Sequence, residues 1–313
     1  MPHFVLIDGN AILHRAYHAL PPLTDKNGVL ANAVYGFFSM YLKIIEDLKP
    51  QYIAVCFDRP KPTFRQALYA GYQQNRPAMK DDLVPQIGMV HKVLEKIKVQ
   101  IFEIDGYEAD DLIGTLAFKS IQDSRFKIQD LEVIIVSGDR DMLQLVNDHV
   151  KVLMPVTGLS NTILHDSESV KKKYGVTPSQ FIDYKALVGD ASDGYPGVSG
   201  IGPKTASGLI NKYGSFENLY KSVGDLPEKI GLKLATDAEQ ASLAKKLATI
   251  VTDAPVRFDA EKCDFKHFSI AGARAAFEEL GFKNLLKRFE GGIKDQSQEE
   301  KSAKGRNQQL GLL

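Results

Sequence analysis

Short runs of β-branched and other apolar residues recur through the first half of the chain, with helical patterns between them. The runs predict strands buried on both faces at residues 4–7, 52–57, 100–104, 131–136 and 150–154. Apolar residues at helical spacing predict helices at residues 33–48, 82–98 and 109–121. This alternation predicts an α/β fold with a mostly parallel, doubly wound sheet.

The strand pattern ends near residue 176, and helical patterns follow it. They cover residues 177–187, 204–213, 216–223, 238–251 and 270–280. We therefore expect an α/β domain over residues 1–175 and an all-helical domain over residues 176–290. Residues 291–313 have almost no apolar content before Leu310, which predicts a flexible tail.

Acidic residues follow four of the predicted strands, and ligands bind at the carboxyl ends of strands in sheets of this kind. The acids at predicted strand ends or loop tips are Asp8, Asp58, Glu108, Asp110, Asp111, Asp139, Asp141, Asp190 and Asp193. If they converge, they cannot all stay ionised without bound cations. Oxygen ligands favour Mg²⁺ or Mn²⁺, and two such ions suit displacement at a phosphodiester.

Each acid also has a purely structural interpretation. A single Asp after a strand is more often a helix cap or a turn former, and the acids from Glu108 to Asp111 are favourable charges at a helix N-terminus. Capping does not require acids after four strands of one sheet, so the set as a whole favours a metal site. Asp141 and Asp190 are the weakest members, since either could act from behind the direct ligands.

A glycine-rich turn lies between two predicted helices of the second domain. The segment Gly200-Ile201-Gly202-Pro203-Lys204-Thr205-Ala206 has two glycines one residue apart and a proline at a first helical position. Free backbone N–H groups of such a turn can approach a phosphate closely. The pattern indicates a helix-hairpin-helix in which Gly200, Gly202, Lys204 and Thr205 contact a nucleic-acid backbone without reading bases.

Residues 59–80 are basic and contain no acid. Basic and aromatic side chains on one helix suit a strand of phosphates with bases stacked alongside. The alternative is a solvated helix whose aromatic rings pack on the domain. The residues concerned are Arg59, Lys61, Phe64, Arg65, Tyr69, Tyr72, Arg76 and Lys80.

Composition narrows the class of protein. The chain has 313 residues, 39 Lys and Arg against 39 Asp and Glu, no Trp, and two cysteines, Cys56 and Cys263. Collagen-like, disulfide-rich and disordered classes are excluded. The apolar runs fall short of the roughly 18 residues that a transmembrane helix needs. No secretory signal is indicated, so we expect a cytoplasmic protein with no membrane partner and, by default, a monomer.

Several motifs together resemble the 5′ nuclease domain of bacterial DNA polymerase I, within the flap endonuclease (5′-3′ exonuclease) family. The resemblance extends from about residue 4 to about residue 289. The motifs match in order and spacing: Leu6-Ile7-Asp8-Gly9-Asn10, the segment 15–23, Phe57-Asp58, Gly106-Tyr107-Glu108-Ala109-Asp110-Asp111, Ser137-Gly138-Asp139-Arg140-Asp141 and Gly189-Asp190-Ala191-Ser192-Asp193.

The resemblance implies a role for each group of residues. Asp8, Asp58 and Glu108 would surround one metal ion, and Asp139, Asp141 and Asp193 a second. Asp110 would lie between the two ions, with Asp111 and Asp190 supplementing the site. Residues 59–80 would begin a helical arch that admits a single-stranded 5′ end, with Arg65, Tyr69 and Lys80 binding DNA and with Tyr72 and Arg76 as catalytic residues at the scissile phosphate. The hairpin would hold the duplex, often with K⁺.

Two positions depart from the family pattern. Gln73 stands where a lysine usually follows the arch tyrosine, and that lysine helps to neutralise the scissile phosphate; Arg76 would compensate in part. Gly194 stands in place of the usual asparagine, which loosens a loop without removing a ligand.

The sequence therefore predicts a Mg²⁺-dependent 5′-3′ exonuclease and flap endonuclease that acts on nicked or branched DNA and on RNA–DNA hybrids. One alternative, motivated by Gln73, is a structure-specific DNA-binding protein with weak or no catalysis. Another is an unrelated metal-dependent phosphatase, which leaves the hairpin unexplained. The chain would be either a stand-alone nuclease or a portion of a larger enzyme.

The final residues offer one more hypothesis. Gln309, Leu310, Leu312 and Leu313 resemble the peptide by which bacterial replication proteins bind the sliding clamp. A flexible tether ending in such a peptide would raise the local concentration of nuclease at nicks and flaps. The alternative is a frayed, mildly apolar terminus.

Overall fold

The computed structural model describes residues 2–123, 131–159 and 161–291. Within these residues a six-stranded sheet has the order β3-β2-β1-β4-β5-β6. The strands are β1 (His3–Asp8), β2 (Tyr52–Cys56), β3 (Gln100–Phe102), β4 (Glu132–Val136), β5 (Val150–Thr157) and β6 (Asn161–His165). All neighbours are parallel except β6, which is antiparallel to β5. The five predicted strands are present, and the edge strand β6 was not predicted.

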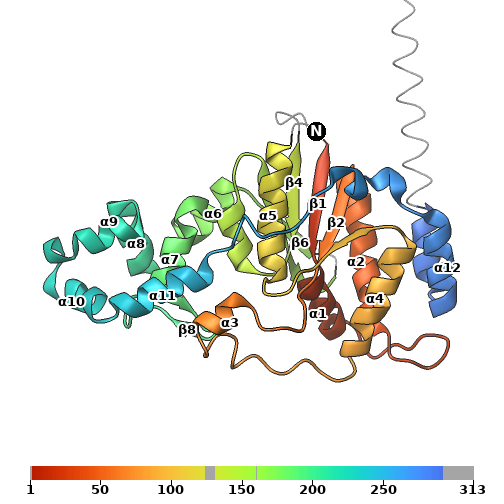
Figure 1. Cartoon of the computed structure of the whole chain (residues 1–313), viewed down its shortest axis with the longest axis horizontal. Helices are drawn as coiled ribbons and strands as arrows, with labels where there is room; N and C mark the ends of the chain where they lie inside the picture. Colours follow the sequence, from red (N-terminus) through yellow and green to blue (C-terminus); the bar gives the residue numbers. More distant parts are fainter. Residues whose placement is uncertain (1, 124–130, 160, 292–313) are drawn as a thin grey trace, which may run out of the picture.

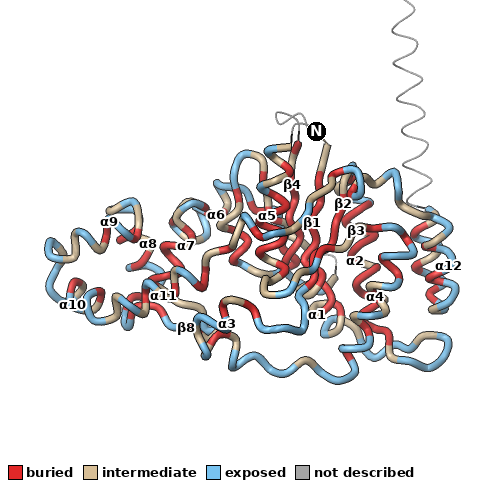
Figure 2. Tube along the Cα trace, in the orientation of Figure 1, coloured by how far each residue is buried: buried red, intermediate tan, exposed pale blue. Residues whose placement is uncertain are grey.

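Helices cover both faces of this sheet (Figure 1). They are α1 (Gly9–Ala19), α2 (Asn32–Leu48), α4 (Val84–Lys96), α5 (Ala109–Gln122) and α6 (Ser167–Tyr174). Alternate residues of β1 show the two layers. Phe4 and Leu6 belong to the core cluster that contains α5 residues, whereas Val5 and Ile7 belong to the cluster with α1, α2 and α4. This two-layered burial along the central strand, red in Figure 2, confirms the predicted α/β fold.

A lobe of helices extends from one side of the sheet (Figure 1). It contains α7 (Phe181–Val188), α8 (Pro203–Tyr213), α9 (Phe216–Lys221), α10 (Glu228–Thr236) and α11 (Ala238–Ala248). A two-stranded antiparallel pair, β7 (Gly189–Asp190) and β8 (Tyr195–Pro196), connects α7 to the glycine-rich turn. The sequence predicted this helical unit but missed α10 and the short strand pair.

The helix α12 (Ile270–Leu280) does not belong to this lobe, which corrects the predicted extent of the helical domain. It lies at the opposite end of the molecule, beside α4 (Figure 1). Ala273, Ala276 and Phe277 are buried in the same core cluster as residues of β1 and α2. Helical periodicity correctly identified α12, but it carries no information about which apolar surface a helix covers.

Residues 59–83, which we call the strap, connect β2 to α4 beneath the carboxyl ends of the strands (Figure 1). Only α3 (Phe64–Leu68) is helical, so the predicted helical arch is limited to five residues. Gly71 and Pro77 disfavour a longer helix. Figure 2 shows that most of the strap is exposed, and its buried side chains are Thr63, Arg65, Tyr72 and Leu83.

No helix among the described residues is both long and apolar enough to cross a bilayer. Cys56 and Cys263 are free thiols, and both are buried. The tail residues Gln309, Leu310, Leu312 and Leu313 lie outside the described residues, as does almost all of the segment 291–313.

The docking of α12 generates a stability prediction. Phe277 is fully buried, so Phe277→Ala should lower the free energy of unfolding by about 3–5 kcal/mol, because it leaves a cavity in the core. Ile270 on the same helix is 45% exposed, and Ile270→Ala should change stability by less than about 0.5 kcal/mol. Urea denaturation measures both variants, and equal small effects would show that α12 does not complete the α/β core.

Candidate metal and nucleic-acid site

A cleft of about 1170 Å³ lies between the carboxyl ends of the strands and the strap. The strap residues Arg76 and Lys80 also line it, together with His14 and His18 of α1. Seven of the nine predicted acids line this cleft: Asp8, Asp58, Glu108, Asp110, Asp139, Asp141 and Asp193. The structure therefore brings together carboxylates that are up to 185 positions apart in the sequence.

Asp8 ends the central strand β1 and caps α1. Its Oδ1 accepts a hydrogen bond from the Ala11 N–H at 2.9 Å, and its Oδ2 accepts one from the Ser137 hydroxyl at 2.6 Å. The pKa of Asp8 is nevertheless raised to about 7, chiefly by burial and to a smaller extent by the charges of Asp58 and Asp139. The chain thus fixes the direction of this carboxylate without neutralising its charge.

Asp58 and Asp110 meet where β2 and α5 approach each other. The Asp58 N–H donates to Asn10 Oδ1 at 2.9 Å, and Asp58 Oδ1 accepts from the Ala109 N–H at 2.7 Å. Asp110 lies in the first turn of α5. Burial, followed by the charges of Asp139 and Asp8, raises the pKa of Asp110 well above its usual range.

Asp139 follows β4 and caps the short 3₁₀ helix Arg140–Leu145, where its Oδ1 accepts from the Asp141 N–H at 2.8 Å. Within the described part of the chain, no Lys or Arg forms an ion pair with Asp8, Asp58, Asp110 or Asp139. Without a protein cation nearby, ionising the buried carboxyls of Asp8 and Asp110 is costly, because each must lose its proton in the field of neighbouring acids. Their oxygen chemistry fits a divalent cation such as Mg²⁺ or Mn²⁺.

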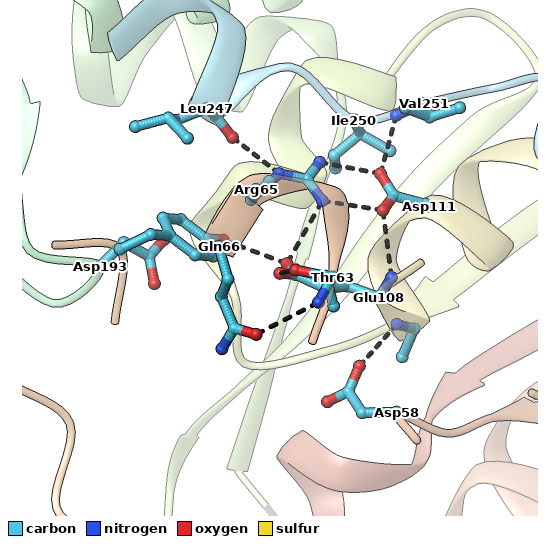
Figure 3. A network of polar contacts seen from close by, with 12 residues as sticks. Asp58, Thr63, Arg65, Gln66, Glu108, Asp111, Asp193, Leu247, Ile250 and Val251 are labelled. Atoms are coloured by element: carbon cyan, nitrogen blue, oxygen red, sulfur yellow. Dashed lines mark hydrogen bonds and ion pairs between the residues drawn. The ribbon is translucent and has the colours of Figure 1, made fainter. Parts of the chain in front are cut away.

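Arg65 reaches the edge of the cleft but is almost fully buried against Asp111, which does not line the cleft, and this corrects two predictions (Figure 3). Arg65 is 2% exposed and binds Asp111 through two hydrogen bonds of 2.7 and 2.8 Å. It also donates to the carbonyl oxygens of Leu247 and Thr249, while the Val251 N–H donates to Asp111. Arg65 therefore cannot reach DNA, and Asp111 is committed to Arg65 rather than to a metal ion.

Glu108 lies between the two environments. Its carboxylate accepts from the Thr63 hydroxyl at 2.9 Å and from the Tyr72 hydroxyl at 3.0 Å, and Arg65 Nη1 is 3.3 Å away (Figure 3). Burial raises the pKa of Glu108, although Arg65 opposes that change. Tyr72 is itself buried, so its direct contact is with Glu108, whose carboxylate it orients toward the cleft.

A buried lysine separates two of the remaining acids. Lys185 Nζ lies 2.7 Å from Asp141 Oδ1 and also contacts Asp190. Oxygen atoms of Asp141, Asp190 and Asp193 lie within 4.8 Å of one another, so Lys185 supplies a positive charge where these three carboxylates meet. Despite burial, hydrogen bonds from Lys185 and Ser192 lower the pKa of Asp190 to about 2. Asp190 does not line the cleft. It instead holds Lys185 in place and accepts a hydrogen bond from the Ser192 N–H in the turn between β7 and β8.

The sequence did not single out Lys185, Ser137, Asn10 or Thr63. Asn10 and Ser137 lie inside recognised motifs, next to Asp8 and Asp139. Lys185 had a usable signal, because it is the one lysine within the apolar helix α7 and is almost fully buried. A lysine in such a helix requires an acidic partner, and Asp141 and Asp190 provide it.

The glycine-rich turn has open backbone groups. Gly200 has φ +69°, a conformation that favours glycine, and no side chain caps the N-terminus of α8 after Gly202. Lys204 and Thr205 are exposed in the first turn of α8. Lys233 of α10 donates to the Gly200 carbonyl at 2.8 Å and so fixes the turn to the rest of the lobe.

The two other predicted DNA-binding residues differ in exposure. Lys80 is exposed, lines the cleft and lies 5.5 Å from the centre of the Tyr17 ring. Tyr69 is half-buried and packs with the small cluster around Tyr72 and Tyr195, away from the cleft lining. Of these two, Lys80 is the one placed to meet a ligand in the cleft.

Comparison with known proteins identifies the family. Residues 3–175 match the model for the 5′-3′ exonuclease N-terminal resolvase-like domain, and residues 176–271 match that for the 5′-3′ exonuclease C-terminal SAM fold. The chain belongs to the 5′-3′ exonuclease family. The resemblance seen in the motifs is thereby confirmed.

Relatives agree with this assignment. The chain is 42% identical over 287 residues to DNA polymerase I of Caldicellulosiruptor bescii, an alignment that covers 91% of the chain and 33% of the relative. It thus spans about a third of that polymerase. It is 37% identical over 287 residues to a 5′-3′ exonuclease of Aquifex aeolicus, which covers 92% of this chain and 95% of the relative.

Solved structures share the fold. The bacteriophage T5 5′-exonuclease, solved with zinc ions, superimposes with a TM-score of 0.63 at 21% identity and covers 93% of this chain and 98% of its own. The catalytic core of Rad2 in complex with DNA substrate superimposes with a TM-score of 0.55 at 16% identity, covering 92% of each chain.

Some of the acids have an arginine or lysine partner and others have none, and this difference generates a prediction for the adjacent residues Asp110 and Asp111. Asp111→Asn leaves the buried Arg65 guanidinium without its charged partner and should cost about 3–5 kcal/mol of stability. Asp110→Asn removes a charge that its neighbours repel, so it should leave the metal-free protein equally stable or more stable. Urea denaturation in EDTA measures both, and similar losses for the two variants would contradict this difference in pairing.

The raised pKa of Asp8 predicts how pH and cations act together. Because its folded-state pKa is about 7 against an ordinary 3.8, its stability contribution is present below pH 4 and is lost as pH rises through 7. A bound divalent cation should offset that loss. The increase in Tm on adding Mg²⁺ or Mn²⁺ should therefore be larger at pH 8 than at pH 5. An increase of equal size at both values would argue against cation binding at these acids.

Proposed function

We propose that this protein is a Mg²⁺- or Mn²⁺-dependent 5′-3′ exonuclease and flap endonuclease that hydrolyses phosphodiesters in nicked or branched DNA. The observation that carries the proposal is the unpaired set Asp8, Asp58, Asp110 and Asp139 in a cleft that Arg76 and Lys80 also line. Carboxylates suit cations and basic side chains suit phosphates, so the cleft combines what hydrolysis of a nucleic-acid backbone requires.

The four unpaired acids would hold the cations, with Glu108, Asp141 and Asp193 at the margins. Bound there, divalent cations neutralise the carboxylates and stabilise the charge that develops on the phosphate. The chain's own residues position the substrate. Arg76 reaches the cleft from the strap and would pair with a phosphate at the reacting centre, while Tyr72 holds Glu108 in place.

The helical lobe would bind the duplex. The uncapped N-terminus of α8, which begins after Gly202, suits phosphate oxygens and presents no base-reading group, which supports recognition of structure rather than of sequence. K⁺ at this turn is part of the proposal. The exposed strap, with Lys80, would contact the 5′ strand, in keeping with the polarity of the family's reaction.

The cellular role is proposed on the same basis. A monomeric cytoplasmic nuclease of this kind would remove flaps and RNA primers during replication and repair, and would therefore also accept RNA–DNA hybrids. Docking on a sliding clamp through Gln309, Leu310, Leu312 and Leu313 would bring it to those sites.

A 5′-labelled flap substrate tests the activity. We expect cleavage near the flap junction with Mg²⁺ and none in EDTA. Asp58→Asn and Asp139→Asn should each lower the single-turnover rate by at least about a hundredfold, because each removes a cation ligand.

Asp148→Asn, at an exposed acid outside the cleft, is the matched control and should cleave at the normal rate. Tight flap binding without cleavage, even in Mn²⁺, would replace the proposal with that of a DNA-binding protein. Undiminished cleavage by both cleft variants would place the active site elsewhere.

A further inference from the structure

The strap is attached to the helical lobe through its backbone. The Gln73 N–H donates to the Asp193 carbonyl at 2.7 Å. Gly194 has φ +74°, and a Cβ at this position would lie 2.8 Å from the Gly71 carbonyl oxygen. The close approach therefore requires glycine at 194. Gln73 has φ 56°, a conformation that non-glycine residues adopt only where surrounding contacts hold it.

This attachment places Arg76 on the Asp193 carboxylate. The Arg76 N–H donates to the Gln73 carbonyl at 2.9 Å, which turns the strap back toward the lobe. Arg76 Nη2 then lies 2.5 Å from Asp193 Oδ1, and Gln73 Nε2 lies 3.5 Å from the same oxygen. The Asp193 side chain is 7% exposed, whereas that of Arg76 is 47% exposed.

The two partners of this ion pair have different ligands in the proposed reaction. Arg76 is the strap guanidinium suited to a phosphate, and Asp193 is a cleft carboxylate suited to a cation. In the DNA-free protein these two side chains bind each other instead of those ligands. The other predicted acids with basic partners, Glu108, Asp111, Asp141 and Asp190, are paired with the buried residues Arg65 and Lys185, but Arg76 is exposed on the strap and can be reached by DNA.

We propose that Arg76 is a cap on Asp193 that the substrate displaces. A phosphate of the bound 5′ strand takes the guanidinium, and the freed Asp193 carboxylate then completes the cation site beside Asp139 and Asp141. The cap links cation binding to DNA binding, so each ligand strengthens the binding of the other. The inference rests on the proposed function for the identity of the two ligands.

Flap binding in EDTA, measured by fluorescence anisotropy, tests the cap without cation or cleavage. Asp193→Asn frees Arg76 and should bind the flap about two- to tenfold more tightly than Asp110→Asn, which removes a cleft charge without an ion-pair partner. In an Arg76→Gln background, Asp193→Asn and Asp110→Asn should bind the flap equally. Equal affinities in the Arg76 protein, or a difference that persists in the Arg76→Gln background, would overturn the cap.

Mn²⁺ titration of the DNA-free protein, followed by electron paramagnetic resonance, gives a second readout. Arg76→Gln should raise the affinity of the weaker Mn²⁺ site severalfold, because Asp193 no longer has a competing partner. Lys80→Gln is the matched control, since it removes one strap charge that is not in an ion pair with an acid.

Equal Mn²⁺ affinities of these two variants would also overturn the cap. Flap cleavage by the wild-type protein, together with its loss in Asp58→Asn, would leave the proposed nuclease function intact in that case. Failure of the cap and failure of the function are therefore separate results.

Discussion

Mutual repulsion among carboxylates governs this structure. Nine acids gather around the carboxyl ends of the strands, and the fold treats them in two ways. Asp111, Asp141, Asp190 and Asp193 each have an arginine or lysine partner, and Glu108 shares Arg65. Asp8, Asp58, Asp110 and Asp139 have none among the described residues, and the pKa values of Asp8 and Asp110 are raised by burial and by the charges of neighbouring acids. Without a bound cation, only protonation of the acids relieves that cost, and protonation is lost as pH rises.

The protein cations also hold the parts of the molecule together. Arg65 joins the strap to α5 through Asp111 and to the end of α11 through the Leu247 and Thr249 carbonyls. Lys185 does the same for the loop that carries Asp190. Buried pairs of this kind fix position more than they add stability. The result is a cleft bordered by buried ion pairs, next to a strap that is mostly exposed.

The local pattern of apolar and acidic residues in the sequence was sufficient to predict much of this arrangement. Apolar runs predicted five of the six strands of the sheet, and acids after four of those strands indicated the cleft. Pattern could not separate Asp110 from Asp111, because adjacent helical positions point about 100° apart and only the packing of α5 decides which one faces the cleft. Nor could it place Arg65, whose basic neighbourhood suggested DNA while its partner lies 46 positions away. The position of α12 depended on long-range packing in the same way.

The most direct measurement is an anomalous diffraction map from crystals of the protein soaked in Mn²⁺. It locates the cations without reference to activity. The strongest peak should lie among the carboxylates of Asp8, Asp58, Asp110 and Asp139, with no peak at Asp111, which is held by Arg65. A map whose peaks lie outside this group of four, or one that shows Mn²⁺ between Arg65 and Asp111, would contradict the account.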